Sequence, residues 1–474
     1  MTTSGDRESF IACQTSQGFD VRGTMLRVDR FKATFEIYSP QLNFQMSEVL
    51  GDFRIVIQGR QVYCGRAVIC GLVPTGTLTV CEVTLDESGL DRTLLSTDKV
   101  AAELGRGFDD FLNQWQKNYK VLSEYKVVIA DMQTFLMDLR LWLGQVELEI
   151  RSSPAGERQD LEKEALQKLG PSIVPAFDAM HERLEAISDG IEEGLRPVHQ
   201  HFAKRQLHPL VLCSPFAYRT HQKPLGYAGD YEMVNMILRD PHEGGSLFAK
   251  IMNLWFLSQW PARAHRNRIQ QLKETIFREI TRRSRAGLPA RILNLGCGPA
   301  REVAELLQEC PLIDQAQFTL LDFNEETVQY TSGLLHDVRR RFGRNAPIQV
   351  LKKSVAQLMK DAARPGAAAP EKQFDMIYCA GLFDYLSDRT CRQLMAVFHQ
   401  WVAPGGLILT TNVDACRPFR NMLEFVLDWN LIYRNEHHAA ALVPAEVLPE
   451  HRFIKRDETG VNLFIEVRKP DDVQ

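Results

Sequence analysis

The feature that most constrains the fold is a glycine-rich turn in RILNLGCGPAREVAELL, residues 291–307. An apolar run of strand length precedes the turn, and apolar residues at helical spacing follow it. Gly296 and Gly298 let the backbone approach a ligand closely, and the N–H groups that begin the following helix point at that ligand. The stretch therefore predicts a strand, a tight turn and a helix that together hold a ligand at the end of the strand.

Strand-like and helix-like runs alternate through the rest of the chain. The further apolar runs are FTLLDF (318–323), IQVLKKS (348–354), FDMIYCAG (374–381) and GLILTTNV (406–413). This alternation predicts an α/β, Rossmann-like domain with a parallel sheet and helices on both faces. The stretch HRFIKRDETGVNLFIEVRK (451–469) reads as two strands joined by a turn, which predicts an antiparallel β-hairpin that closes the sheet.

The N-terminal part has a different pattern. Short β-rich runs with turn residues between them extend from Thr24 to Leu85, and they predict a small antiparallel barrel. The region 1–95 resembles a PilZ-like domain in outline. The arginine pair and the Asp/Asn-x-Ser-x-x-Gly string that bind a cyclic dinucleotide in that family are not evident. A barrel used for contacts is therefore favoured over one that binds a second messenger.

Residues 96–208 form a helical region by their pattern. Apolar residues recur at three- and four-residue spacing in 108–150 and again in 173–202. Amphipathic helices of this kind pack on one another or across a dimer axis, so a homodimer is compatible with the sequence. The third predicted domain spans 209–474, and its first part, 209–285, precedes the glycine turn as a lid segment.

The composition excludes several classes of protein. Of the 474 residues, 45% are hydrophobic and 24% are charged, as in a soluble globular protein of two or three domains. The net charge of −4 gives no reason to expect a nucleic-acid partner. We expect no membrane span and no secretory signal. The 10 cysteines lack C-x-x-C spacing, which predicts buried thiols in the reducing cytoplasm and no metal cluster.

Three further features accompany the glycine turn. Asp322 ends the second strand-like run, Phe374-Asp375 opens the fourth, and Pro404-Gly405-Gly406 precedes the fifth. This order, with the closing hairpin, resembles a class I S-adenosylmethionine-dependent methyltransferase. A nicotinamide dehydrogenase has no expected place for the Pro-Gly-Gly string or the hairpin. The remaining alternative is a Rossmann-like sheet that binds NAD or has lost its ligand.

The resemblance implies S-adenosyl-L-methionine as cofactor and assigns residues to it. Asp322 would accept hydrogen bonds from the ribose hydroxyls, and Ser354 and Val355 would contact the adenine. The predicted cofactor-binding residues are Gly296, Cys297, Gly298, Glu302, Asp322, Phe323, Asn324, Ser354, Val355, Cys379, Ala380, Gly381 and Arg266. Family members often have an acidic residue where this chain has Asn294 and glycine where it has Ala300. We expect these departures to alter detail without loss of binding.

Methyl transfer needs in-line alignment and exclusion of water, so a segment must cover the open edge of the sheet. KPLGYAGDYEMVNMI (223–237) is suited to that role, because its glycines allow a bend and its tyrosines supply flat walls. Further along, PARAHRNRIQQL (261–272) brings Arg263, Arg266 and Asn267 close together, where a guanidinium can bind a carboxylate. The simpler alternatives are a helix cap for Asp230 and a solvated basic face for the arginines.

Four strings carry a narrower resemblance: KPLGYAGDYE, HRNR, GLFDYLSD (381–388) and LDWNLIYR (427–434). They resemble bacterial methyltransferases of 3-hydroxypalmitic acid methyl ester biosynthesis. The resemblance implies O-methylation of the carboxylate of a small molecule such as a 3-hydroxy fatty acid. Asp384 and Tyr385 are the predicted catalytic residues. The predicted substrate-binding residues are Tyr227, Asp230, Tyr231, Asn267, Trp429, Tyr433 and Arg434.

The segment between the fifth strand and the hairpin faces the acceptor in this fold. Its apolar stripe is suited to an acyl tunnel, although core packing is the commoner role of such a stripe. The stripe consists of Phe419, Met422, Phe425, Trp429 and Tyr433, and nearby Arg417, Arg420 and Arg434 are candidates to hold a carboxylate.

Two other functions stay open. One is N- or O-methylation of another metabolite with His437 or His438 as base. The other is a regulatory protein that senses the cofactor and acts through its β domain. A nucleic-acid methyltransferase is disfavoured, because no Asn/Asp-Pro-Pro-Tyr/Phe string follows the fourth strand.

Overall fold

The computed structural model describes residues 9–15, 20–29, 31–37, 44, 48–57, 59–74, 79–86, 121–362, 373–414 and 419–471. The chain divides into two compact units, Met1–Tyr119 and Lys120–Gln474. Each unit has its own core, and the two are described separately below.

The first unit is a closed antiparallel barrel with the strand order β1-β2-β3-β6-β5-β4. Its strands are β1 (Phe10–Gln14), β2 (Asp20–Val28), β3 (Lys32–Ile37), β4 (Val49–Ile57), β5 (Arg60–Pro74) and β6 (Thr79–Leu85). Alternate residues point inwards, as in Lys32–Ile37, where Ala33, Phe35 and Ile37 are buried. The predicted small barrel is confirmed, and it begins earlier than the sequence pattern indicated, at Phe10.

The second unit contains a seven-stranded sheet with the order β12-β13-β11-β10-β7-β8-β9. The strands are β7 (Ala290–Leu295), β8 (Ala316–Asp322), β9 (Ile348–Lys352), β10 (Phe374–Cys379), β11 (Val402–Val413), β12 (Arg452–Arg456) and β13 (Asn462–Arg468). Strands β7 to β11 run parallel, and the hairpin β12–β13 is antiparallel, as predicted. The strand order reverses between β7 and β10, and ligands of open α/β sheets bind beyond the strand ends at such a point.

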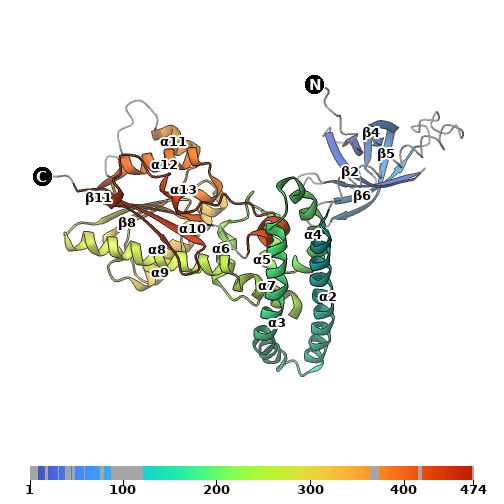
Figure 1. Ribbon diagram of the computed structural model, residues 1–474, viewed down its shortest axis with the longest axis horizontal. Helices are drawn as coiled ribbons and strands as arrows, with labels where there is room; N and C mark the ends of the chain where they lie inside the picture. The colour runs from blue at the N-terminus through green and yellow to red at the C-terminus, as the bar shows by residue number, and fades with distance from the viewer. Residues whose placement is uncertain are drawn as a thin grey trace. The chain divides into compact units, whose positions relative to one another are not determined.

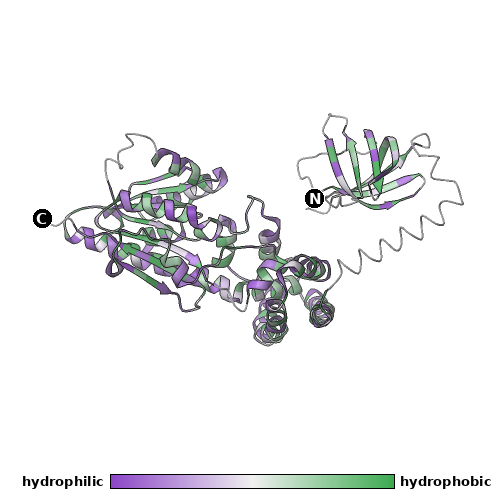
Figure 2. Cartoon of the chain, turned by 45° about the horizontal axis from the view of Figure 1, so that its top comes forward, coloured by the Kyte–Doolittle hydropathy of each residue, from purple (hydrophilic) through white to green (hydrophobic). Residues whose placement is uncertain are grey.

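Helices cover both faces of this sheet (Figure 1). One face packs against α8 (Trp260–Arg285), α9 (Arg301–Glu309) and α10 (Glu325–Arg341). The other packs against α11 (Val355–Ala362), α12 (Asp388–Trp401) and α13 (Glu436–Ala440). Figure 2 shows the apolar residues on the central strands and the polar residues on the outward sides of the helices. This layered α/β architecture confirms the predicted fold class.

The remaining helices precede the sheet. They are α2 (Ser123–Ser152), α3 (Arg158–Asp189), α4 (Arg196–Val211), α5 (Pro215–Gln222), α6 (Tyr231–Leu238) and α7 (Leu247–Ser258). They share one apolar core, which also takes in residues 419–429 from the segment between β11 and the hairpin. The helical region therefore does not form a core apart from the lid segment that follows it. Among the described residues, no helix has the length and apolar character needed to cross a membrane.

Candidate functional site

The glycine turn lies at the end of β7, and its backbone adopts left-handed conformations. Gly296 has φ 71° and Gly298 has φ 50°, which favour glycine because a side chain there is strained. Ala300, which directly precedes α9, also has φ 44°. A non-glycine residue in this region costs about 1–2 kcal/mol, so the loop keeps its shape at some expense of stability.

Asp322 lies beside this turn at the end of β8. Its carboxylate accepts hydrogen bonds from the backbone N–H groups of Gly298, at 3.1 Å, and Asn324, at 3.0 Å. The side chain is only 4% exposed, and burial raises its pKa. The backbone N–H of Phe323 also acts on this carboxylate. A carboxylate offers about four acceptor sites, so the group can still accept a hydrogen bond from a ligand. This geometry suits two adjacent hydroxyl groups.

Behind the turn lies a small buried hydrogen-bond network. The Glu302 Oε1 accepts from the Tyr378 hydroxyl at 2.7 Å and from the Asn294 Nδ2 at 3.4 Å. Burial raises the pKa of Glu302. The Asn294 Oδ1 is buried without a partner among the described residues.

Arg268 on α8 lines the cavity and is a candidate ligand-binding residue that the sequence pattern did not indicate. It is 8% exposed, and among the described residues no hydrogen bond or ion pair within 4.0 Å joins its guanidinium to a side chain, although Asp384 is close enough for its charge to act on it. Gly381, with φ 83°, lets the guanidinium approach: a Cβ at that position would lie 2.9 Å from the Arg268 Nη1. Burial lowers the pKa of Arg268, and Asp384, Tyr385 and Glu302 oppose that effect. An unpaired buried guanidinium calls for an anionic ligand.

These groups line one cavity of about 570 Å³ at the reversal point of the sheet. A volume of this size is typical of small-molecule sites. The predicted site residues that line the cavity are Tyr227, Tyr231, Gly296, Cys297, Gly298, Glu302, Asp322, Phe323, Ser354, Val355, Ala380, Gly381, Asp384, Tyr385 and Trp429.

Asn324 and Cys379 stand close to the cavity but do not line it. Asn324 caps α10, because its side chain accepts from the Thr327 N–H at 3.1 Å. Cys379 is buried in the core behind β10. Phe323 and Ser354 occupy the far end of the cavity wall, where Phe323 is 46% exposed and can stack on a flat ring.

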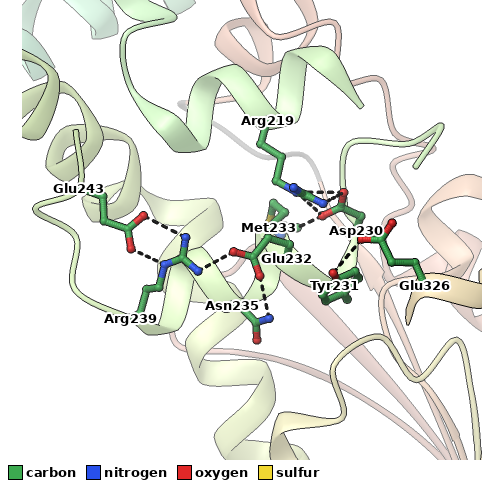
Figure 3. Close-up of polar contacts among 9 residues, drawn as sticks. All are labelled: Arg219, Asp230, Tyr231, Glu232, Met233, Asn235, Arg239, Glu243 and Glu326. Carbon is green, nitrogen blue, oxygen red and sulfur yellow. Dashed lines mark hydrogen bonds and ion pairs between the residues drawn. The ribbon is translucent and has the colours of Figure 1, made fainter. Parts of the chain in front are cut away.

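The cover of the cavity comes from the loop between α5 and α6. Asp230 is fully buried, and its carboxylate caps α6 by accepting from the Met233 N–H at 2.8 Å. The same carboxylate forms a bidentate ion pair with the Arg219 guanidinium (Figure 3). The Tyr231 hydroxyl donates to Glu326 at 2.8 Å, which fastens the loop to α10. Asp230 therefore does not face the cavity, because its carboxylate is used within the cover. Tyr227 and Tyr231 do line it.

Arg266 and Asn267 do not lie where the sequence argument put them. The Arg266 guanidinium donates to the carbonyls of Ile237 and Leu257, near the C-terminal ends of α6 and α7. The Asn267 Nδ2 donates to Asp457 at 3.0 Å, on the side of α8 that faces the hairpin. A helix turns by about 100° per residue, so positions 266 and 267 face away from the cavity that 265, 268, 269 and 272 line.

The segment after β11 contributes Trp429 to the cavity. The Trp429 Nε1 donates to the Tyr385 hydroxyl at 2.9 Å. Arg434 is 2% exposed and donates to Asp388, Asn412 and the carbonyls of Phe383 and Leu386, so it holds the chain around Tyr385 in place. Tyr433 lies under the Arg420 guanidinium, 4.5 Å from ring centroid to Cζ, and away from the cavity.

The apolar stripe is a core feature. Phe419, Met422 and Phe425 pack in the core that the α2–α7 helices form, and only Trp429 of the stripe lines the cavity. His437 and His438 are exposed on α13 and do not line it either. Arg420 pairs with Glu424, and Arg417 lies outside the described residues.

Asp384 is buried beside Arg268 at the end of β10. Its Oδ1 accepts from the Val413 N–H at 2.6 Å. Burial raises the pKa of Asp384 to about 6, while the Val413 hydrogen bond and the charges of Arg268 and Arg434 act in the opposite direction. The carboxyl group therefore changes its charge close to neutral pH.

The polar groups that face the cavity fit S-adenosylmethionine one by one. Arg268 can bind a carboxylate, and Asp322 can bind a ribose diol. Phe323, Ser354 and Val355 can contact a purine. The glycines leave the space that this ligand needs along the turn.

The comparisons with known proteins agree with this chemistry. Residues 265–450, less than half of the chain, match the family model described as a methyltransferase domain. No curated protein matches the chain.

Several solved structures are similar in fold to parts of the chain. A possible exported protein from Bordetella parapertussis is 17% identical over 67% of this chain and 99% of its own, with a TM-score of 0.39. The N-methyltransferase NodS from Bradyrhizobium japonicum WM9, in complex with S-adenosyl-L-homocysteine, is 15% identical over 53% of this chain and 100% of its own, with a TM-score of 0.30.

Magnesium protoporphyrin IX methyltransferase (ChlM) from Synechocystis PCC 6803, with the same ligand bound, is 10% identical over 53% of this chain and 98% of its own, with a TM-score of 0.35. Likenesses at this level carry no argument about the substrate. The family match and the chemistry of the cavity together lead to one conclusion: the chain contains a class I methyltransferase domain and is an S-adenosylmethionine-dependent methyltransferase.

Proposed function

We propose that this methyltransferase O-methylates the carboxylate of a small apolar acid, such as a 3-hydroxy fatty acid. The observation that carries the proposal is the state of the Tyr385 hydroxyl. Its oxygen accepts hydrogen bonds from the Trp429 Nε1 and from the backbone N–H of Gly229. Among the described residues, none accepts the hydroxyl proton, so Tyr385 is left as a donor at the cavity wall.

A phenol that can only donate favours an acceptor oxygen with negative charge. Burial raises the pKa of Tyr385, so its proton stays in place at neutral pH. A carboxylate oxygen accepts such a hydrogen bond and is nucleophilic without a base. An amine, by contrast, needs its lone pair for the reaction and would gain nothing from a donor there.

Apolar side chains also line this end of the cavity. Val234, Val413, Trp429 and Leu431 line it and suit a hydrocarbon chain. S-adenosylmethionine, when bound, supplies a methyl group that its positive sulfonium activates. The chain contributes orientation through Tyr385 and exclusion of water through the loop that carries Tyr227 and Gly229.

The test uses cofactor with a labelled methyl group, the purified protein and a small-molecule extract of bacterial cells. We expect label in an organic-extractable product that mild base hydrolyses, as a carboxylic ester does. Asp322→Ala should abolish the label, because it removes the groups proposed to bind the ribose. Tyr385→Phe should lower kcat without the same effect on cofactor binding. A labelled product that resists base would overturn carboxyl methylation.

A second candidate is methylation of a hydroxyl or amine with Asp384 as base. The raised pKa of Asp384, about 6, favours it, because a general base works best with a pKa near the working pH. With such an acceptor the rate should rise as pH increases through 6. With a carboxylate acceptor, the rate above pH 6 should be independent of Asp384 ionisation.

The N-terminal barrel has no part in this proposal. Its relation to PilZ-like domains and a regulatory role stay predictions. Cofactor binding without turnover, together with a ligand for the barrel, would favour a sensor.

A further inference from the structure

A single face of α8 forms part of the cavity wall. Positions 265, 268, 269 and 272 follow helical spacing, and all four line the cavity. Ile269 and Leu272 are apolar, and the Arg268 guanidinium lies beside Gly381 in the part of the cavity that we assign to the cofactor. His265, one turn earlier, has no role in the chemistry described above.

The His265 ring is held in one tautomer. Its Nδ1 lies 2.8 Å from the carbonyl oxygen of Pro261. A carbonyl can only accept, so Nδ1 carries the proton and Nε2 carries the lone pair. Burial lowers the pKa of His265 to about 3, and the nearby charges of Arg268 and Arg266 act in the same direction. The ring is therefore neutral at any physiological pH.

His265 lies at the acceptor end of the cavity. The adjacent residue, Ala264, packs against Val413, and Leu431 packs against the same small cluster. Val413 and Leu431 line the cavity together with His265. The His265 side chain is half-buried and lines this cavity, and its Nε2 has no hydrogen-bond partner among the described residues.

We propose that His265 determines acceptor specificity: its Nε2 accepts a hydrogen bond from a hydroxyl or N–H group that the methyl acceptor carries beside its reacting carboxylate. The inference rests on the proposed function for the carboxylate. The two groups are complementary, since Tyr385 only donates and the neutral His265 accepts through Nε2. An acid without a second donor would displace water from the Nε2 and leave it unpaired in the complex, which costs binding energy. The substrate class is therefore a hydroxylated or amidated apolar acid.

The test measures binding and does not depend on turnover. Calorimetry on the S-adenosylhomocysteine-loaded protein gives Kd for two acids of equal chain length, one with a 3-hydroxyl group and one without. We expect the wild type to bind the hydroxylated acid at least about tenfold more tightly. In His265→Phe the ratio should fall close to one, because the unsubstituted acid keeps its affinity. His265→Gln, which retains an acceptor, should restore part of the preference.

His437→Phe is the matched control, since that histidine is exposed on α13. It should leave the ratio unchanged. The inference is overturned if the wild type shows no preference, if neither acid binds, or if His265→Phe weakens both acids equally. Failure of the proposed function looks different: both acids bind with the expected ratio, but neither yields a base-labile labelled product.

Discussion

The two walls of the cavity differ in what their polar side chains do. On the wall formed by the sheet edge and α8, the Asp322 carboxylate keeps acceptor sites for a ligand, and the Arg268 guanidinium has no close ion-pair partner among the described residues. On the cover wall, the polar groups pair with one another, as Asp230 does with Arg219 and Tyr231 with Glu326 (Figure 3).

The difference separates binding from stability. A polar group whose hydrogen bonds are satisfied inside the protein contributes to folding. When it is removed, its partner stays buried without a hydrogen bond, which costs stability. A polar group that faces the cavity contributes to binding, and it costs stability while no ligand is present. The same residue types in one motif can therefore have opposite roles.

The largest expected effect tests the cover wall. Asp230→Asn removes the charge that compensates Arg219 but keeps an acceptor for the cap of α6, so the free energy of unfolding should fall by about 3–5 kcal/mol through the broken ion pair. Affinity for S-adenosylhomocysteine, measured at a temperature where the variant is folded, should be close to that of the wild type. Urea unfolding and calorimetry check the two parts.

Asp240→Asn is its control, because the Asp240 side chain is 73% exposed. That variant should lose less than about 1 kcal/mol. If Asp230→Asn loses much cofactor affinity but no stability, Asp230 takes part in binding, and the distinction between the two walls is wrong.

The next effect concerns the sheet-edge wall. Asp322→Asn keeps one carbonyl acceptor but loses the charge and the second acceptor. Affinity for S-adenosylhomocysteine should fall about a hundredfold, which corresponds to about 3 kcal/mol. The free energy of unfolding should change by less. Asp337→Asn, an exposed change on α10, provides the matched control for charge removal.

Asp384, which also lines the cavity, should make the free energy of unfolding depend on pH. Its pKa is raised from 3.8 to about 6, so its protonated form is favoured in the folded state. The stability that this group contributes is fully present below pH 4 and is lost as pH rises through 6. The loss amounts to about 3 kcal/mol.

Asp384→Asn should remove this contribution. The decline in the free energy of unfolding between pH 4 and pH 6 should then be shallower in the variant than in the wild type. Urea titrations at several pH values measure it. Parallel curves for the two proteins would mean that burial of Asp384 does not raise its pKa.

The smallest expected effect has opposite signs for binding and folding. Arg268→Gln should weaken S-adenosylhomocysteine about thirtyfold, or about 2 kcal/mol, because an ionic hydrogen bond is lost. The free energy of unfolding should stay the same or rise, because an unpaired buried charge is removed. Arg263→Gln on the exposed side of α8 should change neither quantity. A destabilised Arg268→Gln with normal affinity would make Arg268 structural.

Much of the sheet-edge wall could be predicted from local sequence. Gly296 and Asp322 follow strand-like runs directly, and residues after parallel strands meet at one edge of the sheet. The local pattern pointed to Arg266 and did not single out Arg268, because it gives helical spacing but not the rotation of the helix about its axis. That rotation is set by tertiary packing of α8 against α6, α7 and α9 and against β7 and β10.

The contact between Tyr385 and Trp429 was also beyond the reach of local pattern. These residues are 44 positions apart, and a hydrogen bond joins them only because the segment after β11 returns to the sheet. Backbone bonds from Ile432 to Asp384 and from Arg434 to Val413 hold that return in place. The stripe from Phe419 to Tyr433 has continuous helical spacing, yet Phe419, Met422, Phe425 and Trp429 all pack in the helical core, and of the stripe only Trp429 also lines the cavity.

The sequence by itself determined the succession of strands and helices along the chain, the glycine turn and the acidic residue that ends β8, because each depends on spacing within a short segment. The tertiary structure alone decided which polar side chains pair within the protein and which face the cavity. Pairing depends on segments up to hundreds of residues apart meeting in space, as Asn421 and Glu185 do across 236 positions. Which groups are left to bind a ligand is therefore a property of the folded chain.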